Sequence, residues 1–221
     1  MRWHPQDEEI LHRPAPVLEQ DEDDDEDYDE EAETRGEEDE KLSEKVLKTR
    51  TILVSESISD ELARKVYQQI LVLEAESAEK PITVLINSPG GEADSGFGIY
   101  DMLHFTAAPV RTIVAGLCAS AAVMVFLAGA KGFRLATPNS RFLLHQPSSQ
   151  SFGQAADLKI ASEEIVKLRK RYNGIVAEVT GKGLEQINHD ADRDFWLNAV
   201  EAVEYGLVDR VVAKRTEIDP A

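Results

Sequence analysis

The sequence predicts an α/β protein with mostly parallel strands. Short apolar segments rich in β-branched residues alternate with helical patterns between residues 41 and 212, in four consecutive strand-then-helix units. Successive units of this kind place their strands side by side in one parallel sheet. The apolar run from Val114 to Gly129 is too short to span a membrane, because a spanning helix needs about 20 apolar residues. The run therefore indicates a buried helix in the core.

Two strand-then-helix units are predicted between residues 51 and 105. The strand Thr51–Ser55 leads to a helix that Ser59 can cap, because a serine hydroxyl can accept from a free N–H of the first turn. Apolar residues repeat along one face of this helix, at Leu62, Val66, Ile70 and Leu73. The strand Ile82–Ser88 ends at Pro89-Gly90-Gly91, and a helix is expected over Asp94–Phe105. The glycine pair leaves N–H groups unhindered, which suits an extended peptide, an oxyanion or simply a tight turn.

The third unit carries the first candidate for chemistry. The strand Val110–Ala115 is expected to stop at Gly116, which would place Ser120 in the first turn of the following helix. Free backbone N–H groups and the positive end of the helix dipole gather there, and they would stabilise an oxyanion beside the hydroxyl. A buried serine that only bonds the carbonyl one turn back is the alternative interpretation.

The rest of the chain predicts an oligomer. Two short strands at Phe133–Ala136 and Arg141–His145 form the fourth unit, and one long helix follows over Ala155–Val179. About 25 residues at 1.5 Å each make a helix of about 37 Å, longer than a small domain needs. We therefore expect this helix to project and to pack against another subunit. A short helix over Asn198–Tyr205 and a last strand over Leu207–Val212 complete the prediction.

The acidic charge is concentrated at the N-terminus. Of the formal net charge of −18, residues 1–40 carry −16, from 19 acidic and 3 basic residues, and residues 41–221 carry −2. Like charges repel and bury little, so residues 1–40 are expected to form a disordered acidic arm, either a solvating tail or a partner-binding segment. Residues 41–221 are expected to form one domain. Its nearly neutral charge offers no basic footprint for nucleic acid or for a membrane surface.

The cysteine content and the N-terminal residues favour a cytoplasmic protein. Cys118 is the only cysteine, which excludes an internal disulfide, and no apolar segment resembling a secretory signal is found at the N-terminus. No phosphate-binding glycine motif follows a strand. The segment from Asp190 to Glu201 resembles a calcium-binding loop, but Phe195 occupies the position at which the turn of such a loop needs glycine. The acidic positions of this imitation are Asp190, Asp192, Asp194 and Glu201. Neither a metal nor a cofactor is predicted.

His145 and Asp194 could complete a catalytic triad with Ser120. His145 ends an apolar strand, where an α/β sheet presents site residues, although a capped core histidine is the alternative. A general base needs an acid that fixes its tautomer, and residues 189–194 supply candidates. Asp194 borders the apolar Phe195 and is expected to be the most buried of these carboxylates, whereas His189 is expected in a charged loop.

Seven motifs together resemble one known family. They fall in that family's order and at its spacing, with no gap between the catalytic positions when the two are compared: Ile86-Asn-Ser-Pro-Gly-Gly91, Ile99-Tyr-Asp101, Ala119-Ser120, Pro138-Asn-Ser-Arg141, His145-Gln-Pro147, Arg193-Asp194 and Glu201–Asp209. From about Leu42 to Val212 the sequence resembles the proteolytic subunit of the Clp protease. An α/β-hydrolase is not indicated, because the G-x-S-x-G elbow is absent and the order is serine, histidine, aspartate.

The resemblance implies a crotonase-like β/α spiral, with the long helix as a projecting handle, and the activity of a serine endopeptidase. Ser120 would be the nucleophile, His145 the base and Asp194 the acid that orients the base. The oxyanion hole would consist of the backbone N–H groups of Gly91 and Ala121.

The same resemblance implies a substrate and partners. The Gly90-Gly91 segment and the loop after Pro147 would pair as strands with the backbone of an unfolded polypeptide. Two stacked heptameric rings, joined through the long helix and the loop before it, would enclose a chamber. A hexameric AAA+ unfoldase would feed the chamber and hydrolyse ATP, since this chain has no nucleotide motif.

Two features depart from the family pattern. The family usually has Met after the nucleophile, where this chain has Ala121, so activity is expected with an altered primary pocket. The acidic arm is long where the family's N-terminal segment is usually short. Two other functions stay open: a weakly active structural ring subunit beside an active paralogue, and a crotonase-type lyase or hydratase of coenzyme A thioesters, in which the triad would have no clear purpose.

Overall fold

The structure, a computed structural model, describes residues 41–148 and 152–218. The chain divides into a unit of residues 1–44 and a compact unit of residues 45–221, and the sheet lies in the second. The predicted acidic arm, residues 1–40, lies outside the described residues, as does part of the loop that follows Ser148.

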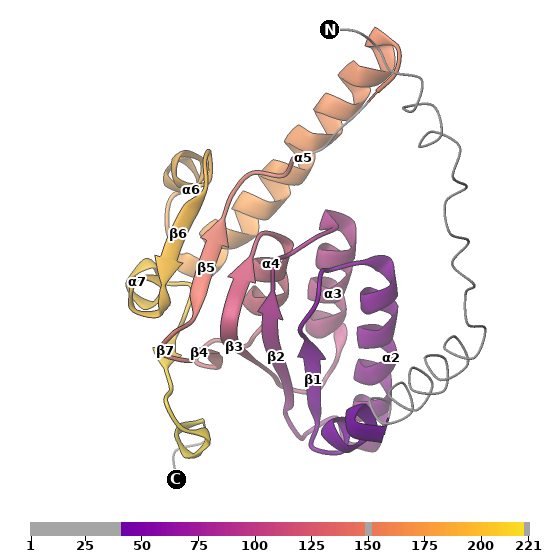
Figure 1. Cartoon of the computed structure of the whole chain (residues 1–221), viewed down its shortest axis with the longest axis vertical. Coiled ribbons are helices and arrows are strands. Elements are labelled where there is room, and N and C mark those ends of the chain that lie inside the picture. The colour runs from indigo at the N-terminus through magenta and orange to yellow at the C-terminus, as the bar shows by residue number, and fades with distance from the viewer. Residues whose placement is uncertain (1–40, 149–151, 219–221) are drawn as a thin grey trace, which may run out of the picture. The chain divides into compact units, whose positions relative to one another are not determined.

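A seven-stranded sheet forms the centre of this unit in the described part of the chain (Figure 1). Its parallel strands lie in the order β1 (Thr51–Val54), β2 (Ile82–Ser88), β3 (Val110–Ala119), β4 (Arg134–Ala136) and β7 (Arg210–Val211). β5 (Arg141–Leu144) pairs parallel with the end of β3, and β6 (Phe195–Asn198) pairs antiparallel with β5. The α/β class and the parallel order of the first strands are confirmed, whereas β6 was not predicted.

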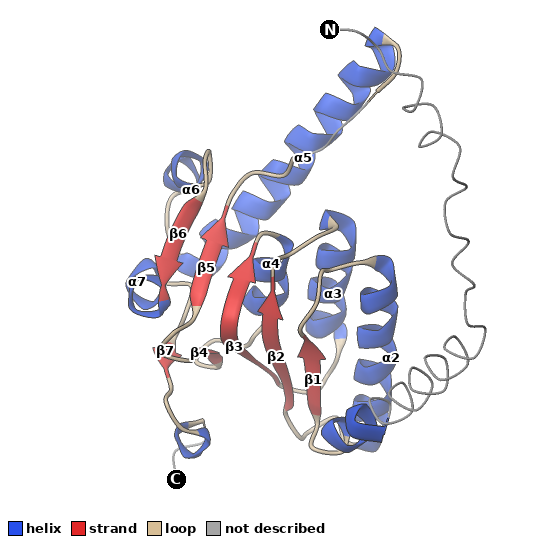
Figure 2. Cartoon of the chain, in the orientation of Figure 1, coloured by secondary structure: helices blue, strands red, loops and turns tan. Residues whose placement is uncertain are grey.

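Helices cover one face of the first strands (Figure 2). They are α2 (Asp60–Glu76), α3 (Ala93–Phe105) and α4 (Ala121–Leu127). Ser59 caps α2 as predicted, because its Oγ accepts from the Leu62 N–H at 3.2 Å. The predicted apolar face of α2 is buried in the main core, which it shares with the inward side chains of β1 and β2.

The expected end of the third strand at Gly116 is wrong, since β3 continues to Ala119. Gly116 has a φ of +113°, which glycine adopts without penalty, so the strand bends there and goes on. The side chain of Asn87 accepts from the Leu117 N–H at 2.9 Å and replaces a ladder bond at the bend. Beyond the bend, β3 pairs with β5 instead of β4. Ser120 is therefore the N-cap of α4 and not a residue of its first turn.

The long helix α5 (Ala155–Thr180) agrees with its prediction within one residue at the C-terminus and extends well beyond the sheet (Figure 1). Only its C-terminal half contains buried residues, and it exposes Leu158, Ile160 and Val166 to solvent. The expected charged loop around His189 is wrong, because that residue belongs to α6 (Leu184–Asp190). α7 (Ala199–Tyr205) follows with a capping box at Asn198, and a 3-10 turn, η2, spans Arg215–Glu217.

An ion pair between the buried Arg134 and the partly buried Asp209 joins β4 to the segment before β7. Asp209 Oδ1 accepts from Arg134 Nη2 at 2.8 Å, and Oδ2 accepts from Arg134 Nε at 3.2 Å. Oδ2 also accepts from the backbone N–H groups of Gly132 and Arg134, at 2.8 and 2.9 Å. Partial burial acts to raise the pKa of Asp209, but the bonds from Arg134 and Gly132 outweigh it and hold that pKa below its usual value.

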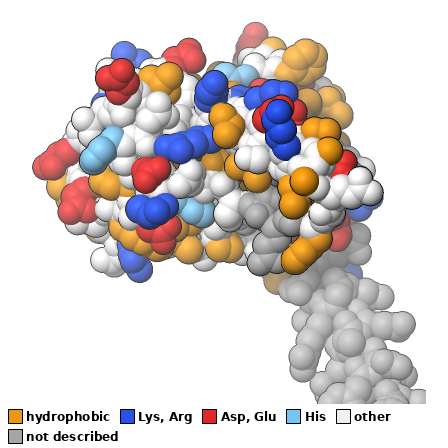
Figure 3. Space-filling view, turned by 90° about the horizontal axis from the view of Figure 1, so that it is seen from above, with side chains coloured by type: hydrophobic (Ala, Val, Ile, Leu, Met, Phe, Trp, Pro, Cys, Tyr) orange, Lys and Arg blue, Asp and Glu red, His pale blue; other side chains and the backbone are white. Residues whose placement is uncertain are grey.

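The described surface carries charges of both signs. On the face seen in Figure 3, Lys and Arg side chains lie among Asp and Glu side chains. Within residues 41–148 and 152–218, no helix has the length and apolarity needed to cross a membrane. The same residues contain no cluster of three or more His, Cys, Asp or Glu that could hold a metal ion, so the acids that imitate a calcium loop do not gather as ligands.

Candidate active site

Ser120 occupies a strained turn between β3 and α4. Its φ of +55° with a ψ of −124° is uncommon for a residue that is not glycine. Three backbone contacts hold it: its N–H donates to Leu143 O at 2.9 Å, and its C=O accepts from Val123 N at 3.0 Å and from the Tyr172 hydroxyl at 3.4 Å. The Ser120 hydroxyl does not cap α4. Strain maintained by surrounding contacts is a common property of functional sites.

The glycine turn after β2 lies directly against Ser120. Gly90 has a φ of +89°, and a Cβ atom built on it would lie 2.5 Å from Ala119 O and 2.8 Å from Ser120 Cβ. Only glycine fits such a close approach. Ser88 fixes the turn, since its Oγ accepts from the Gly90 N–H at 3.1 Å and donates to Glu56 O at 2.6 Å.

Two N–H groups beside this turn suit an oxyanion. Gly91 forms a parallel bridge with Ile58, whose N–H donates to Gly90 O at 2.8 Å and whose C=O accepts from Glu92 N at 2.9 Å. In such a bridge the N–H of the middle residue, Gly91, points away from the bridging strand. Ala121 is the first residue of α4, so its N–H has no partner within the helix.

The pairing of β5 with β6 brings His145 and Asp194 together. The ladder ends at the pair Leu144–Phe195. His145 directly follows β5 and Asp194 directly precedes β6, so these two residues face each other. His145 Nδ1 lies 3.7 Å from Asp194 Oδ1, with 28% of the histidine side chain and 65% of the aspartate side chain exposed. The expectation that Asp194 is the most buried of the nearby carboxylates is therefore wrong.

Asp190 is the buried carboxylate of this segment, with 11% of its side chain exposed. Its Oδ2 accepts from the Tyr205 hydroxyl at 2.7 Å, and its Oδ1 accepts from Gln186 Nε2 at 2.7 Å. Burial acts to raise the pKa of Asp190, and these bonds together with His189 outweigh it, so the pKa lies below its usual value. Asp190 thus joins α6 to α7, and Asp194 is left beside the histidine.

A pocket of about 220 Å³ collects most of the predicted site residues. Ser120, His145, Gly91, Ala121 and Pro147 line it, whereas Gly90 and Asp194 lie next to lining residues and do not line it themselves. The structure adds a set of mainly apolar lining residues, namely Glu92, Phe97, Met124, Ile165, Leu168 and Tyr172. The sequence signal for the apolar residues among them was the apolar periodicity of the helices, which does not say which faces meet.

This arrangement can support acyl transfer. It combines a hydroxyl, an imidazole, a carboxylate near that imidazole and two N–H groups beside an apolar pocket. Among the described residues no hydrogen bond joins Ser120 Oγ to His145, and the 3.7 Å between His145 and Asp194 is longer than a hydrogen bond. Such bonds are often long without substrate and shorten in the complex.

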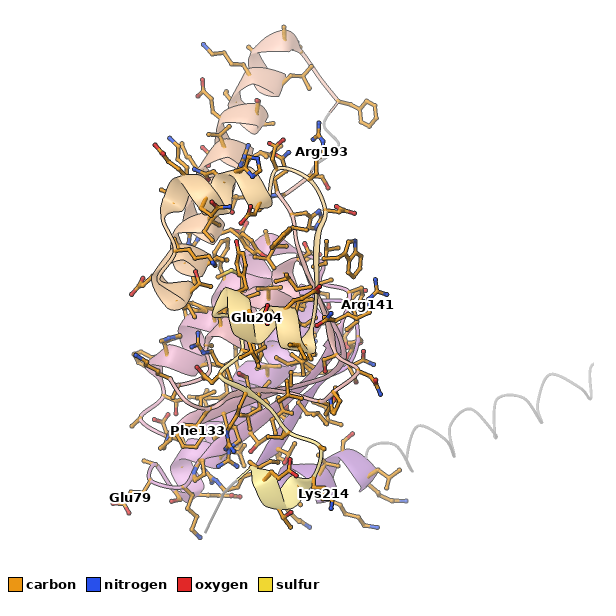
Figure 4. The ribbon with its side chains drawn as sticks, turned by 90° about the vertical axis from the view of Figure 1, so that its left-hand side faces the viewer. Glu79, Phe133, Arg141, Arg193, Glu204 and Lys214 are labelled. Atoms are coloured by element: carbon orange, nitrogen blue, oxygen red, sulfur yellow. The ribbon has the colours of Figure 1, made fainter. Side chains whose placement is uncertain are left out.

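A larger cavity, of about 570 Å³, lies at the other ends of the strands and contains none of the predicted site residues. Its lining includes several cations and no carboxylate; the cations are Arg50, Lys80, Arg111, Lys214 and Arg215. Figure 4 shows Lys214 near the bottom of the unit and Arg193, which precedes Asp194, in its upper part. The smaller pocket is the candidate active site, because Ser120 and His145, the predicted nucleophile and base, both line it.

Comparison with known proteins gives the family. The sequence model of the Clp protease family matches residues 34–215. The chain belongs to the Clp protease family. The predicted family membership and fold class are thereby confirmed.

Individual Clp proteins agree with this assignment. A Treponema denticola protein named ATP-dependent Clp protease proteolytic subunit 2 is 45% identical over 181 residues, which cover 82% of this chain and 90% of the relative. A Treponema pallidum protein of the same name is 43% identical over 175 residues, covering 79% and 88%. A solved structure, of a mutant of ClpP1 from Listeria monocytogenes, is 39% identical with a TM-score of 0.75, covering 80% of this chain and 99% of that one.

Proposed function

We propose that this chain is the proteolytic subunit of an ATP-dependent Clp-type protease and acts as a serine endopeptidase on unfolded polypeptides. The main support is the convergence of Ser120, His145, Gly91 and Ala121 around one pocket, with Asp194 3.7 Å from His145. Membership of the Clp protease family agrees with peptidase chemistry.

In the proposed mechanism, His145 takes the proton of Ser120 Oγ as the oxygen attacks the peptide carbonyl carbon. The Gly91 and Ala121 N–H groups stabilise the negative charge that develops on the carbonyl oxygen. Asp194 keeps the proton on Nδ1 of His145 and stabilises the imidazolium. His145 then gives its proton to the leaving amine. In the second half of the reaction His145 takes a proton from water as the water attacks the acyl-enzyme, and it returns that proton to Ser120 Oγ as the product acid leaves.

The proposed assembly consists of stacked heptameric rings that a hexameric AAA+ unfoldase supplies with substrate in the cytoplasm. Leu158, Ile160 and Val166 are exposed in the N-terminal half of α5, which contains no buried residue. They support a contact between subunits, since burial there would remove this apolar surface from water. ATP is assigned to the unfoldase, in agreement with the ATP-dependent names of the two relatives and with the absence of a phosphate-binding motif in this sequence.

Substitution of the nucleophile tests the proposal. Ser120→Ala is expected to lower kcat for an unstructured peptide by about 10⁶-fold, as removal of a triad serine does elsewhere, with the mass of the assembly unchanged. A fluorophosphonate should label the wild-type chain at Ser120. Peptide hydrolysis by Ser120→Ala at the wild-type rate would contradict the assignment.

A weakly active structural ring subunit is the second candidate, and the open spacing between His145 and Asp194 favours it. An assembled wild-type oligomer that is not labelled by fluorophosphonate would support this candidate. Turnover of a coenzyme A thioester would instead support the lyase or hydratase.

A further inference from the structure

Arg169 on α5 contacts both chain segments that carry the base and its acid. Its Nη1 donates to Gln146 Oε1 at 3.1 Å, and Gln146 directly follows His145. Its Nη2 donates to Asn188 O at 3.1 Å and to Asp192 Oδ1 at 3.3 Å. One guanidinium therefore connects the end of β5 with the loop between α6 and β6.

The two segments are also joined to each other. Gln146 Nε2 donates to Asp192 O at 2.8 Å, so Gln146, Asp192 and Arg169 form a closed set of contacts, which we call the clamp. Arg169 Nε is buried and has no hydrogen-bond partner among the described residues, so packing also holds the guanidinium in place. Asn173 Nδ2, one turn further along α5, donates to Asn188 Oδ1 at 2.7 Å and anchors the same side of α6.

The clamp lies just beyond the end of the β5–β6 ladder. The last ladder pair is Leu144–Phe195, and the clamp joins Gln146 to Asp192. His145 and Asp194 therefore lie between the ladder on one side and the clamp on the other, and no ladder bond sets their separation. Contacts beyond the ladder must set it.

We propose that Arg169 is a positioning residue that keeps His145 and Asp194 aligned for proton transfer with Ser120. The inference rests on the proposed function. A planar guanidinium suits the role, because its donors diverge in a fixed fork and reach acceptors on two segments at once. An ammonium is a point charge and holds such a pair of acceptors less firmly.

The test uses the full chain carrying Arg169→Gln. A misplacement of catalytic groups by about 1 Å can cost about 100-fold, so kcat for an unstructured peptide is expected to fall by about 10- to 100-fold. KM is expected to stay within about threefold, because Arg169 does not line the substrate pocket. The rate of fluorophosphonate labelling of Ser120 should fall together with kcat, because both need an aligned base. Arg169→Lys should restore part of both rates.

The matched control is Lys170→Gln. Lys170 is exposed and follows Arg169 on α5, so this variant removes the same charge from the same helix. Its kcat and labelling rate should equal those of the wild type. Mass measurement on every variant separates misalignment from loss of assembly.

Several outcomes would overturn the inference. A kcat for Arg169→Gln within twofold of the wild type would do so, and so would a change confined to KM. If Arg169→Gln does not assemble, Gln146→Ala and Asp192→Asn replace it, because each removes part of the clamp; an unchanged kcat in both variants contradicts the role. If fluorophosphonate labels the wild type and Arg169→Gln at equal rates, this inference is disproved and the proposed function is not. If it does not label the wild type, the proposed function is contradicted.

Discussion

Asp209 and Asp194 each lie beside a basic side chain, and their surroundings differ in almost every respect. Asp209 accepts four hydrogen bonds from Gly132 and Arg134, and 18% of its side chain is exposed. Asp194 lies 3.7 Å from His145 and is 65% exposed. A carboxylate whose acceptor positions are filled by fixed donors stabilises the fold. One with free acceptor positions can respond when its histidine gains a proton.

The same contrast between fixed and free groups separates the Arg134–Asp209 pair beside β4 from the pocket at the end of β5. At the Arg134–Asp209 pair every carboxylate oxygen is hydrogen-bonded and the arginine side chain is only 7% exposed. At the pocket, the backbone of Ser120 is strained, and its hydroxyl does not cap α4. The fixed ion pair therefore lies beside β4 and β7, and the candidate reactive groups lie at the ends of β3 and β5.

Among the predictions that test this contrast between the two aspartates, the largest expected effect belongs to Asp194→Asn. An amide at this position would favour the wrong histidine tautomer, so kcat for a peptide should fall by about 10⁴-fold. The free energy of unfolding should change by less than about 0.5 kcal/mol, because the side chain is mostly exposed. Peptide kinetics and urea unfolding measure the two quantities. Glu204→Gln, an exposed acid on α7, is the control.

Retention of more than a tenth of the wild-type kcat by Asp194→Asn would place the orienting acid elsewhere. A large loss of stability in the same variant would remove the contrast with Asp209.

Asp209→Asn should give the opposite result. It leaves the buried Arg134 without its counter-charge, and breaking such a pair costs about 3 kcal/mol. The free energy of unfolding, measured by urea at one fixed protein concentration, should fall by about that amount, while kcat well below the melting temperature should stay within twofold. A variant as stable as the wild type would show that the pair does not hold β4 to β7.

The sequence predicted the elements that carry strong local signals. The cap at Ser59 and the apolar face of α2 follow from residues close in the chain, and both are present. β6 has no such signal, because only one of its four residues is buried and the strand exists through its pairing with β5. Gly116 gave a misleading signal, because a positive φ can bend a strand as well as end it.

The candidate site was also predicted only in part, because some of its residues carry local signals and others are brought together only by the fold. Ser120 and His145 could be proposed because residues at strand ends meet at one edge of a parallel sheet. The burial of Asp194 could not be inferred, since its apolar neighbour Phe195 predicted a core position that Asp190 holds instead. Arg169 could not be found, because its acceptors lie on two segments that only the fold brings together.

Low pH should reduce the free energy of unfolding, because it protonates the hydrogen-bonded carboxylates of Asp209 and Asp190. This is the smallest of the three effects predicted for this contrast. Asp209 and Asp190 have pKa values held below the ordinary 3.8. The unfolded chain therefore binds protons at a higher pH than the folded one, so this stabilisation is complete above about pH 4 and is lost as pH falls through the lower folded-state pKa values. The free energy of unfolding, measured by urea from about pH 5 to pH 3, should fall less steeply in Asp209→Asn than in the wild type. Glu204→Gln should follow the wild-type slope, and equal slopes in all three chains would show that the bonds to Asp209 do not hold its pKa down.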